Sequence, residues 1–203
     1  MRYTDGHKAS TRSGIVQTAA REFRRKGASA VSVADIMKAE GLTHGGFYRH
    51  FKDKDALLIE AVETALQEVS EELLQLTANR PRSQALEHVI KFYLSDAHLA
   101  HPERGCAFAA LGAELARYPK RCRAPIAGAL DKYRSQLQSL LPGKTEHERK
   151  ASFDVLFPSM AGCLTAARAQ VDRARQIEML ESAREFFINA FCSGQSERGR
   201  GLS

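Results

Sequence analysis

A cluster of hydrogen-bond donors lies near the N-terminus, at His44, Tyr48, Arg49, His50 and Lys54. Their imidazole, phenol, guanidinium and ammonium groups suit phosphate oxygens, and some of them suit the edges of bases. A short helix with small residues at its start and donors along its length fits the major groove of DNA. The types and spacing of these residues therefore point to recognition of double-stranded DNA.

Two short helices joined by a glycine turn are predicted to carry this cluster. Ser32 is expected to cap the first helix, with Asp35 three residues later as its capping-box partner. Gly41 ends that helix, and Thr43 caps the second, which runs to about His50. This is the pattern of a helix-turn-helix, in which the second helix reads the DNA.

A preceding helix, predicted over about residues 10–26, completes a small core. Its apolar residues recur at four-residue spacing and end at Phe23. Phe47 and Phe51 are also four residues apart, so both are expected to point inward against Phe23 and Ile36. The outer side of the second short helix is thereby left to His44, Gly45, Tyr48 and Arg49.

Eleven residues are predicted to contact DNA, and several of them have a second interpretation. Thr43 can cap its helix, touch a phosphate, or do both. His44 can reach a base edge or a phosphate, or it can be an exposed histidine with no role. Gly45 and Gly46 let the backbone approach DNA, or they simply suit a helix start. The full set is Lys8, Arg12, Ser32, Thr43, His44, Gly45, Gly46, Tyr48, Arg49, His50 and Lys54.

The remaining contacts are expected to be with the DNA backbone. Tyr48 and His50 are predicted to donate to phosphates, with packing of Tyr48 on the first helix as the alternative. Lys54 is a phosphate ligand or a solvated lysine. Lys8 and Arg12 are expected to clamp the backbone or to enter the minor groove.

The positive charge of the chain is concentrated beside these residues. Residues 1–54 hold 11 Lys and Arg against 5 Asp and Glu, whereas residues 55–203 hold 19 of each. The formal net charge of +6 thus favours a polyanionic partner, with a merely basic soluble surface as the alternative. Arg24, Arg25 and Lys26 are interpreted as a solvated helix end that complements the helix dipole.

The rest of the chain is predicted to be helical, which gives an all-α fold with about nine helices in total. We expect a helix-turn-helix DNA-binding domain over residues 1–54, a helical ligand-binding and dimerisation domain over residues 55–193, and a disordered tail over residues 194–203. Predicted long helices include residues 54–77 and residues 83–100.

Other classes of protein are not indicated by the sequence. No apolar run reaches the ~18 residues that span a bilayer, and no signal peptide is recognised, so a cytoplasmic protein without membrane contact is expected. No phosphate-binding loop, nucleophile elbow or paired metal-ligand motif is present, so we expect no enzyme, no metal site and no cofactor. The four cysteines form no CxxC pair, and most are interpreted as small buried hydrophobes.

The run from residue 41 to residue 57 resembles the DNA-binding signature of the TetR family of bacterial transcription regulators. The family pattern is Gly-x-[Ser/Thr]-x-Gly-x-[Leu/Phe]-Tyr-x-His-Phe-x-x-Lys-x-x-Leu. It is matched at Gly41, Thr43, Gly45, Phe47, Tyr48, His50, Phe51, Lys54 and Leu57. Upstream, the spacing of Ala19, Phe23 and Gly27 also resembles the family, so that the likeness covers about residues 10–58.

This resemblance implies a homodimer joined through its last two helices, a repressor that binds a pseudo-palindromic operator and is released by a small-molecule inducer. Residues on helices that would enclose the inducer, each equally suited to core packing, are Phe92, Tyr93, Cys106, Phe108, Leu111, Phe157, Met160 and Cys163. Cys106 is also a candidate sensor of electrophiles. The segment Arg104-Gly105-Cys106 with Glu114 resembles a variant found in one group of these regulators. The alternative function is a helical adaptor that binds protein partners only.

Overall fold

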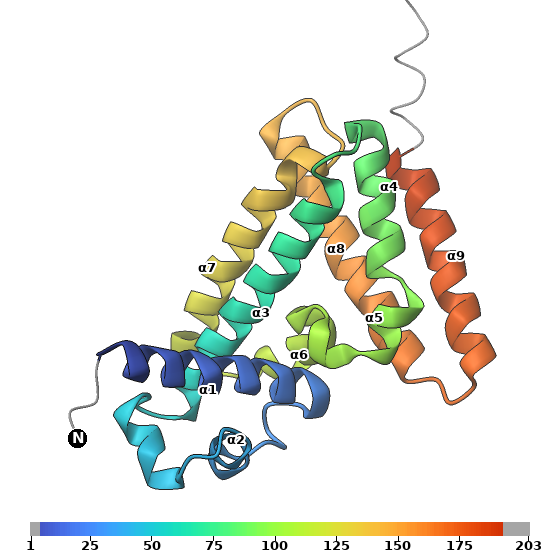
Figure 1. The fold of residues 1–203 in the computed structure, drawn as a ribbon. Coiled ribbons are helices and arrows are strands. Elements are labelled where there is room, and N and C mark those ends of the chain that lie inside the picture. The colour runs from blue at the N-terminus through green and yellow to red at the C-terminus, as the bar shows by residue number, and fades with distance from the viewer. Residues whose placement is uncertain (1–4, 193–203) are drawn as a thin grey trace, which may run out of the picture. The chain divides into compact units, whose positions relative to one another are not determined.

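The computed structural model describes residues 5–192, apart from the side chains of residues 5, 82 and 83, and within them every regular element is a helix (Figure 1). The predicted all-α class is confirmed. The α-helices are α1 (Asp5–Lys26), α2 (Val33–Ala39), α3 (Lys54–Thr77), α4 (Arg82–Tyr93), α5 (Asp96–Ala100), α6 (Ala107–Leu115), α7 (Lys120–Leu137), α8 (Glu146–Arg168) and α9 (Arg173–Cys192). The 3₁₀ helices are η1 (His44–Arg49), η2 (Pro102–Arg104) and η3 (Gln138–Leu140).

The chain forms two compact units. The first unit comprises residues 1–67 and 102–129, and the second comprises residues 68–101 and 130–203. The first unit therefore extends well past residue 54, because η2, α6 and the start of α7 pack with the N-terminal helices. The functional division at residue 54 stays a prediction. All the excess charge lies in the first unit, which holds 16 Lys and Arg against 10 Asp and Glu, while the second holds 14 of each.

The core of the first unit is built around α1. This helix contacts α2, η2 and α6, and its inner face buries Ile15 and Phe23 completely. Gly27 ends α1 with a φ of +88°, a conformation in which other residues are strained, and its N–H donates to the Phe23 carbonyl at 2.8 Å. Ile36 and Phe47 are at most 1% exposed and complete the core from α2 and η1.

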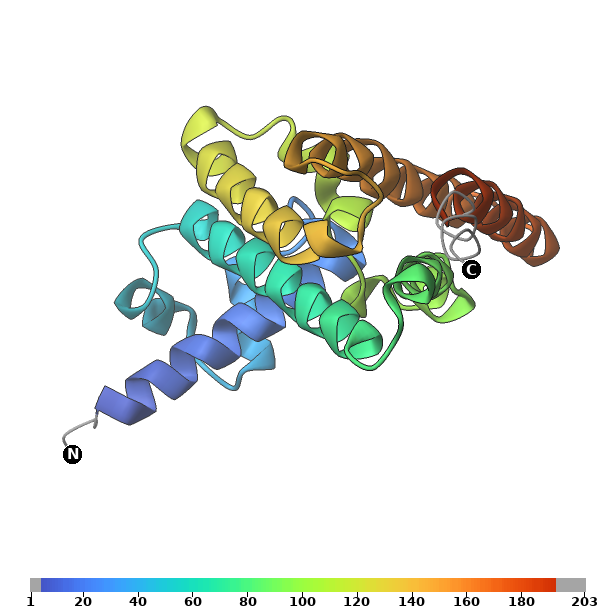
Figure 2. The ribbon, with the colours of Figure 1, turned by 90° about the horizontal axis from the view of Figure 1, so that it is seen from above.

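The second unit contains a helical hairpin. Figure 1 shows α8 and α9 running in opposite directions, Figure 2 shows α4 (green) beside α9 (dark red), and α9 packs against both helices. Aromatic rings fill the core beneath them, with Phe153 and Phe157 stacked at 4.6 Å between ring centroids. Tyr133 and Tyr93 meet Phe157 edge-on at 5.7 and 6.1 Å. Aromatic packing thus holds α4, α7 and α8 together.

The predicted helix over residues 83–100 is wrong as a single element. It divides into α4 and α5 because Ser95 acts as a new N-cap, its hydroxyl accepting from the His98 N–H at 3.2 Å. Across residues 5–192, no helix is both long and apolar enough to cross a membrane. The predicted disordered tail lies outside the described residues.

Candidate DNA-binding site

The predicted helix-turn-helix is present in the first unit. Ser32 caps α2 through the expected capping box, since its hydroxyl accepts from the Asp35 N–H at 3.1 Å and its own N–H donates to the Asp35 carboxylate at 3.1 Å. Gly41 adopts a φ of +69° and turns the chain, after which the Leu42 N–H donates to the Met37 carbonyl at 2.8 Å. These bonds fix the angle at which the second helix leaves α2.

The second helix is a 3₁₀ helix, and the predicted side-chain cap by Thr43 is wrong. The Thr43 hydroxyl makes no capping bond. Its carbonyl instead accepts from the Gly46 N–H at 3.0 Å, which is the tight turn that closes a 3₁₀ helix. The 3₁₀ helix extends over six residues, and its two consecutive glycines disfavour the α-helical alternative. Thr43 is exposed, and its predicted phosphate contact stays a prediction.

The inner and outer faces of η1 are as predicted. Phe47 is fully buried and stacks on the buried Phe51 at 5.4 Å between ring centroids. On the outer face Tyr48 is 64% exposed, and its ring meets that of the exposed His44 edge-on at 5.9 Å. Arg49 is also exposed. Buried phenylalanine rings thus anchor a segment whose donors all face solvent.

The two glycines of η1 differ in their surroundings. A methyl group added to Gly45 would meet no atom within 4 Å, whereas one on Gly46 would lie 3.6 Å from the Met37 and Thr43 side chains. Gly45 is therefore an open place on the outer face, where backbone can approach another molecule.

Arg12 is already engaged, which the sequence did not predict. Its guanidinium forms two hydrogen bonds of 2.5 Å with the Glu60 carboxylate and lies 4.6 Å from the centroid of the Phe51 ring. Lys8 is exposed, and the Lys54 ammonium lies 5.9 Å from the centroid of the Phe23 ring. A phosphate contact by Arg12 would have to compete with Glu60. Glu60 belongs to no local sequence motif and lies 48 positions from Arg12, so this pairing could not be predicted.

His50 is half-buried at the C-terminal end of η1. Burial lowers the pKa of its imidazole, and the positive charges of Lys8, Arg12 and Arg49 lower it further. Its Nδ1 atom is buried and has no hydrogen-bond partner among residues 5–192. The imidazole thus sits in positive surroundings that an anionic partner would offset.

The interpretation of Arg24 as part of a solvated helix end is wrong. Arg24 is only 4% exposed, and its guanidinium donates to the Ala20 carbonyl at 3.0 Å and to the Gly105 carbonyl at 2.9 Å. The guanidinium stays buried because backbone oxygens satisfy it. Arg25 and Lys26 remain at the surface and pair with Glu22.

A second bond between distant segments involves Glu114 of α6. Its carboxylate accepts from the Ala28 N–H at 2.9 Å, from the Ser29 N–H at 2.6 Å and from the Ser29 hydroxyl. Together with the bond from Arg24 to Gly105, this ties residues 105–114 to the turn between α1 and α2. Sequence reasoning noted Gly105 and Glu114 as part of a motif but assigned them no role.

The residues predicted to line an inducer cavity fall in both compact units. Cys106, Phe108 and Leu111 lie in the first unit, and the other five lie in the second: Phe92, Tyr93, Phe157, Met160 and Cys163. Most are buried in packed cores, while Phe92, Phe108 and Cys163 are half-buried. Their ligand role stays a prediction.

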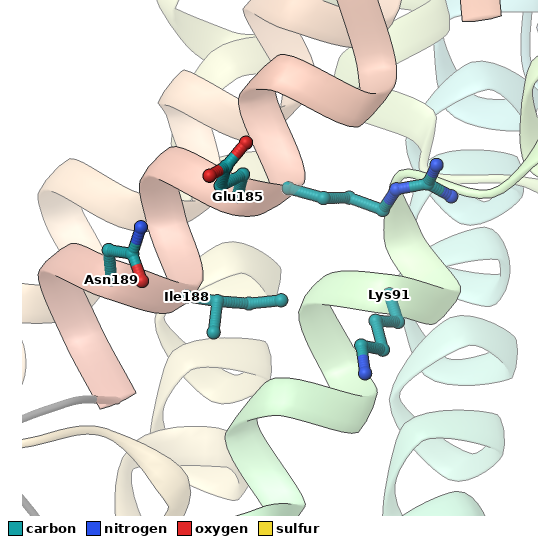
Figure 3. Close-up of a pocket in the computed structure, with 5 residues that line it drawn as sticks. Lys91, Glu185, Ile188 and Asn189 are labelled. Atoms are coloured by element: carbon teal, nitrogen blue, oxygen red, sulfur yellow. The ribbon is translucent and has the colours of Figure 1, made fainter.

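The second unit also has an open groove of about 510 Å³ between α4 and α9, lined by Lys91, Arg184, Glu185, Ile188 and Asn189. Figure 3 shows Lys91 of α4 across the groove from Ile188 of α9. Lys91 pairs with Glu87 at 2.6 Å. None of the eight predicted ligand residues lines this groove.

Comparison with known proteins agrees with this geometry. The family model "Bacterial regulatory proteins, tetR family" matches residues 15–61, which contain the helix-turn-helix. The HTH-type transcriptional regulator AcrR of Shigella flexneri is 38% identical over 80 residues, which are 39% of this chain and 37% of that protein. The chain thus spans little more than a third of that relative.

Solved structures match over most of the chain at low identity. A TetR-family regulator from Agrobacterium tumefaciens has a TM-score of 0.72 at 18% identity, covering 90% of this chain and 98% of the other. The regulator FadR from Bacillus subtilis, solved with stearoyl-CoA, has a TM-score of 0.65 at 18% identity, covering 87% and 97%. Residues 15–61 thus match the TetR family of bacterial regulatory proteins, and the chain has the fold of the solved TetR-family regulators compared above.

Proposed function

We propose that this protein is a transcriptional repressor that binds a pseudo-palindromic DNA operator as a homodimer and leaves it when a small molecule binds. The outer face of η1 is the observation that carries this proposal. Exposed donors project there from a segment anchored by Phe47, in the compact unit that holds all the excess positive charge. Such a face suits the major groove, and the charge suits phosphates.

The residues are proposed to divide between base and backbone contacts. His44 and the exposed backbone at Gly45 would face base edges, because they lie at the start of η1 on its open side. Tyr48, His50, Lys54 and the other predicted donors would contact phosphates. Ser32 is already used in the capping box, so its share in DNA binding would be indirect.

The dimer is proposed to form through the α8–α9 hairpin. Large apolar side chains are exposed there, with Val155 at 57%, Phe186 at 66% and Ile177 at 37%. Gly162 lies seven residues after Val155 and is also exposed, so the outer face of α8 offers small and apolar groups for close helix contact. A dimer would present two copies of η1 to successive major grooves, about 34–36 Å apart.

Release by an inducer is proposed to act through the segments that join ligand and DNA sites. Helices α3 and α7 each continue from one compact unit into the other. A ligand within the second unit that tilts α3 would spread the two copies of η1, so that both half-sites could no longer be bound together. The bonds of Arg24 and Glu114 would carry movement of residues 105–114 to the turn after α1.

The test begins with selection of operator sequences from a random duplex library by the full chain. Footprinting of the selected duplex should show two half-sites related by a dyad. The double substitution Tyr48→Ala with His50→Ala should abolish binding while the helical content and the dimer persist. A folded wild-type protein that selects no duplex at low salt would refute the proposal.

The same double variant distinguishes the proposed repressor from the alternative function, a helical adaptor that binds protein partners only. An adaptor would keep its protein partner after both substitutions, since neither residue would belong to its interface. Binding of duplex by the wild type, lost in the variant, excludes the adaptor reading.

A further inference from the structure

A second group of cations lies in the first unit, away from the helix-turn-helix motif in sequence. Arg117, Lys120, Arg121 and Arg123 fall within seven residues, in the turn after α6 and the first turn of α7. All four are exposed. We call these four residues the α7 basic patch.

The α7 basic patch is fixed against the start of α3. The Arg121 guanidinium donates to the Asp55 carboxylate at 2.9 Å, and the thiol of Cys122 donates to the same oxygen at 3.4 Å. Cys122 itself is fully buried, so its side chain fixes the first turn of α7 against the protein interior. Asp55 directly follows Lys54 and lies six residues after Arg49, the last residue of η1. The patch is therefore anchored to the start of α3, which follows η1 in sequence, within one compact unit.

The other three cations of the patch have no acidic partner. Within residues 5–192, Arg117, Lys120 and Arg123 form no ion pair. Some exposed cations of the second unit are paired, since Lys150 pairs with Asp154 and Arg175 with Glu178 along their own helices, whereas Lys132 and Lys144 form no ion pair within the described residues.

This arrangement is unfavourable for the isolated protein. The first turn of α7 contains no acidic residue, and cations near the start of a helix meet the positive end of its dipole. Like charges gathered in seven residues also repel one another. Local preferences broken in this way are expected at functional sites, and a partner of opposite charge would relieve the repulsion.

We propose that the α7 basic patch binds phosphates of the same DNA duplex, beside the groove occupied by η1, as a second backbone contact of each subunit. The inference rests on the proposed function. Duplex DNA carries one negative charge per about 1.7 Å of its axis, so a cationic surface anchored to the start of α3 finds phosphates over a wide range of positions. Arg121 is held by Asp55, and the three unpaired side chains supply the contacts.

The experiment compares two triple variants by the salt dependence of their affinity for the selected operator. The test variant is Arg117→Gln, Lys120→Gln and Arg123→Gln. The matched control is Lys132→Gln, Lys144→Gln and Lys150→Gln, which removes three exposed cations from the second unit. Both proteins keep η1 intact, and circular dichroism and light scattering check their fold and assembly.

Three phosphate contacts in each of the two subunits correspond to a change of about 5.4 in the slope of log affinity against log salt. Between about 50 and 200 mM salt, the wild-type dimer should therefore lose about 2,000-fold more affinity than the test variant. The control should keep the wild-type slope.

An unchanged slope in the test variant overturns the inference. An equal decrease of the slope in the test and control variants also overturns it, because that result would reflect total charge alone. Binding of the patch to anionic vesicles, with operator affinity unaffected by the substitutions, would assign it to a membrane instead and also overturns the inference. Absence of DNA binding by the wild type would refute the proposed function itself.

Discussion

Substitution of Gly45 by alanine should strengthen the fold and weaken DNA binding at the same time. The added methyl group would meet no atom within 4 Å, and Gly45 does not have a positive φ. Loss of glycine's freedom in the unfolded chain should therefore stabilise the protein by about 0.4–1 kcal/mol. For a chain of this length, that raises the melting temperature by about 1–4 °C.

The same methyl group would stand where the proposed site brings backbone against DNA. If it prevents close approach, operator affinity should fall at least about tenfold, or roughly 1.4 kcal/mol. Gly128 offers a matched control, because it is an exposed glycine of α7 in the same unit and an added methyl group there also meets nothing within 4 Å. Gly128→Ala should be stabilised without losing DNA affinity.

The assays are thermal unfolding by circular dichroism and titration of labelled operator by fluorescence anisotropy. Wild-type affinity in a stabilised Gly45→Ala protein would refute the close approach of this backbone to DNA. Destabilisation would refute the local geometry instead.

Three further predictions concern other parts of the molecule. The pKa of His50 is lowered by burial and by its positive neighbours, whereas a bound phosphate would raise it, so operator affinity should increase as pH falls from about 7 to about 5.5. His50→Gln should remove that dependence in binding titrations. The stability of the free protein should move the opposite way, falling as pH drops below about 6.5, because the unfolded chain takes up this proton more readily. Glu114→Ala should raise the hydrogen-exchange rates of the Ala28 and Ser29 amides and weaken operator binding. Unchanged exchange rates would show that these bonds do not hold the turn between α1 and α2. Phe186→Glu should shift the dimer towards monomer in light scattering, with helical content retained, and a persistent dimer would place the interface elsewhere.

The local pattern around the helix-turn-helix was sufficient to predict its positions. Ser32 and Asp35 carry their capping bonds within four residues, and the burial of Phe47 follows from helical periodicity. The helix type of η1 could not be predicted, because the competition between an α-helix and a 3₁₀ helix depends on how two glycines are held by the surrounding core. The missing Thr43 side-chain cap follows from that same choice.

Contacts across long sequence separations were beyond prediction. Glu60 meets Arg12 across 48 positions, and the Arg24 guanidinium reaches Gly105 across 81. Arg24 lies in a run of three cations whose pattern is typical of a solvated surface, and the distant Gly105 carbonyl is one of the oxygens that make its burial tolerable. The boundary of the first compact unit was missed for the same reason, since residues 102–129 carry no signal of where they pack.

The first unit is built from two separate segments of the chain, so it cannot be transferred to another protein as one continuous piece. A chimera that grafts only the first 54 residues onto another effector would leave behind the Gly105 carbonyl that accepts from Arg24 and the Glu114 carboxylate that holds the Ala28 and Ser29 amides. A transplanted reading head would need residues 102–129 as well, either in place or donated by a similar stretch in the recipient. Exchange of DNA-binding regions between relatives should therefore succeed when the N-terminal segment and residues 102–129 are moved together, and fail when either segment is moved alone.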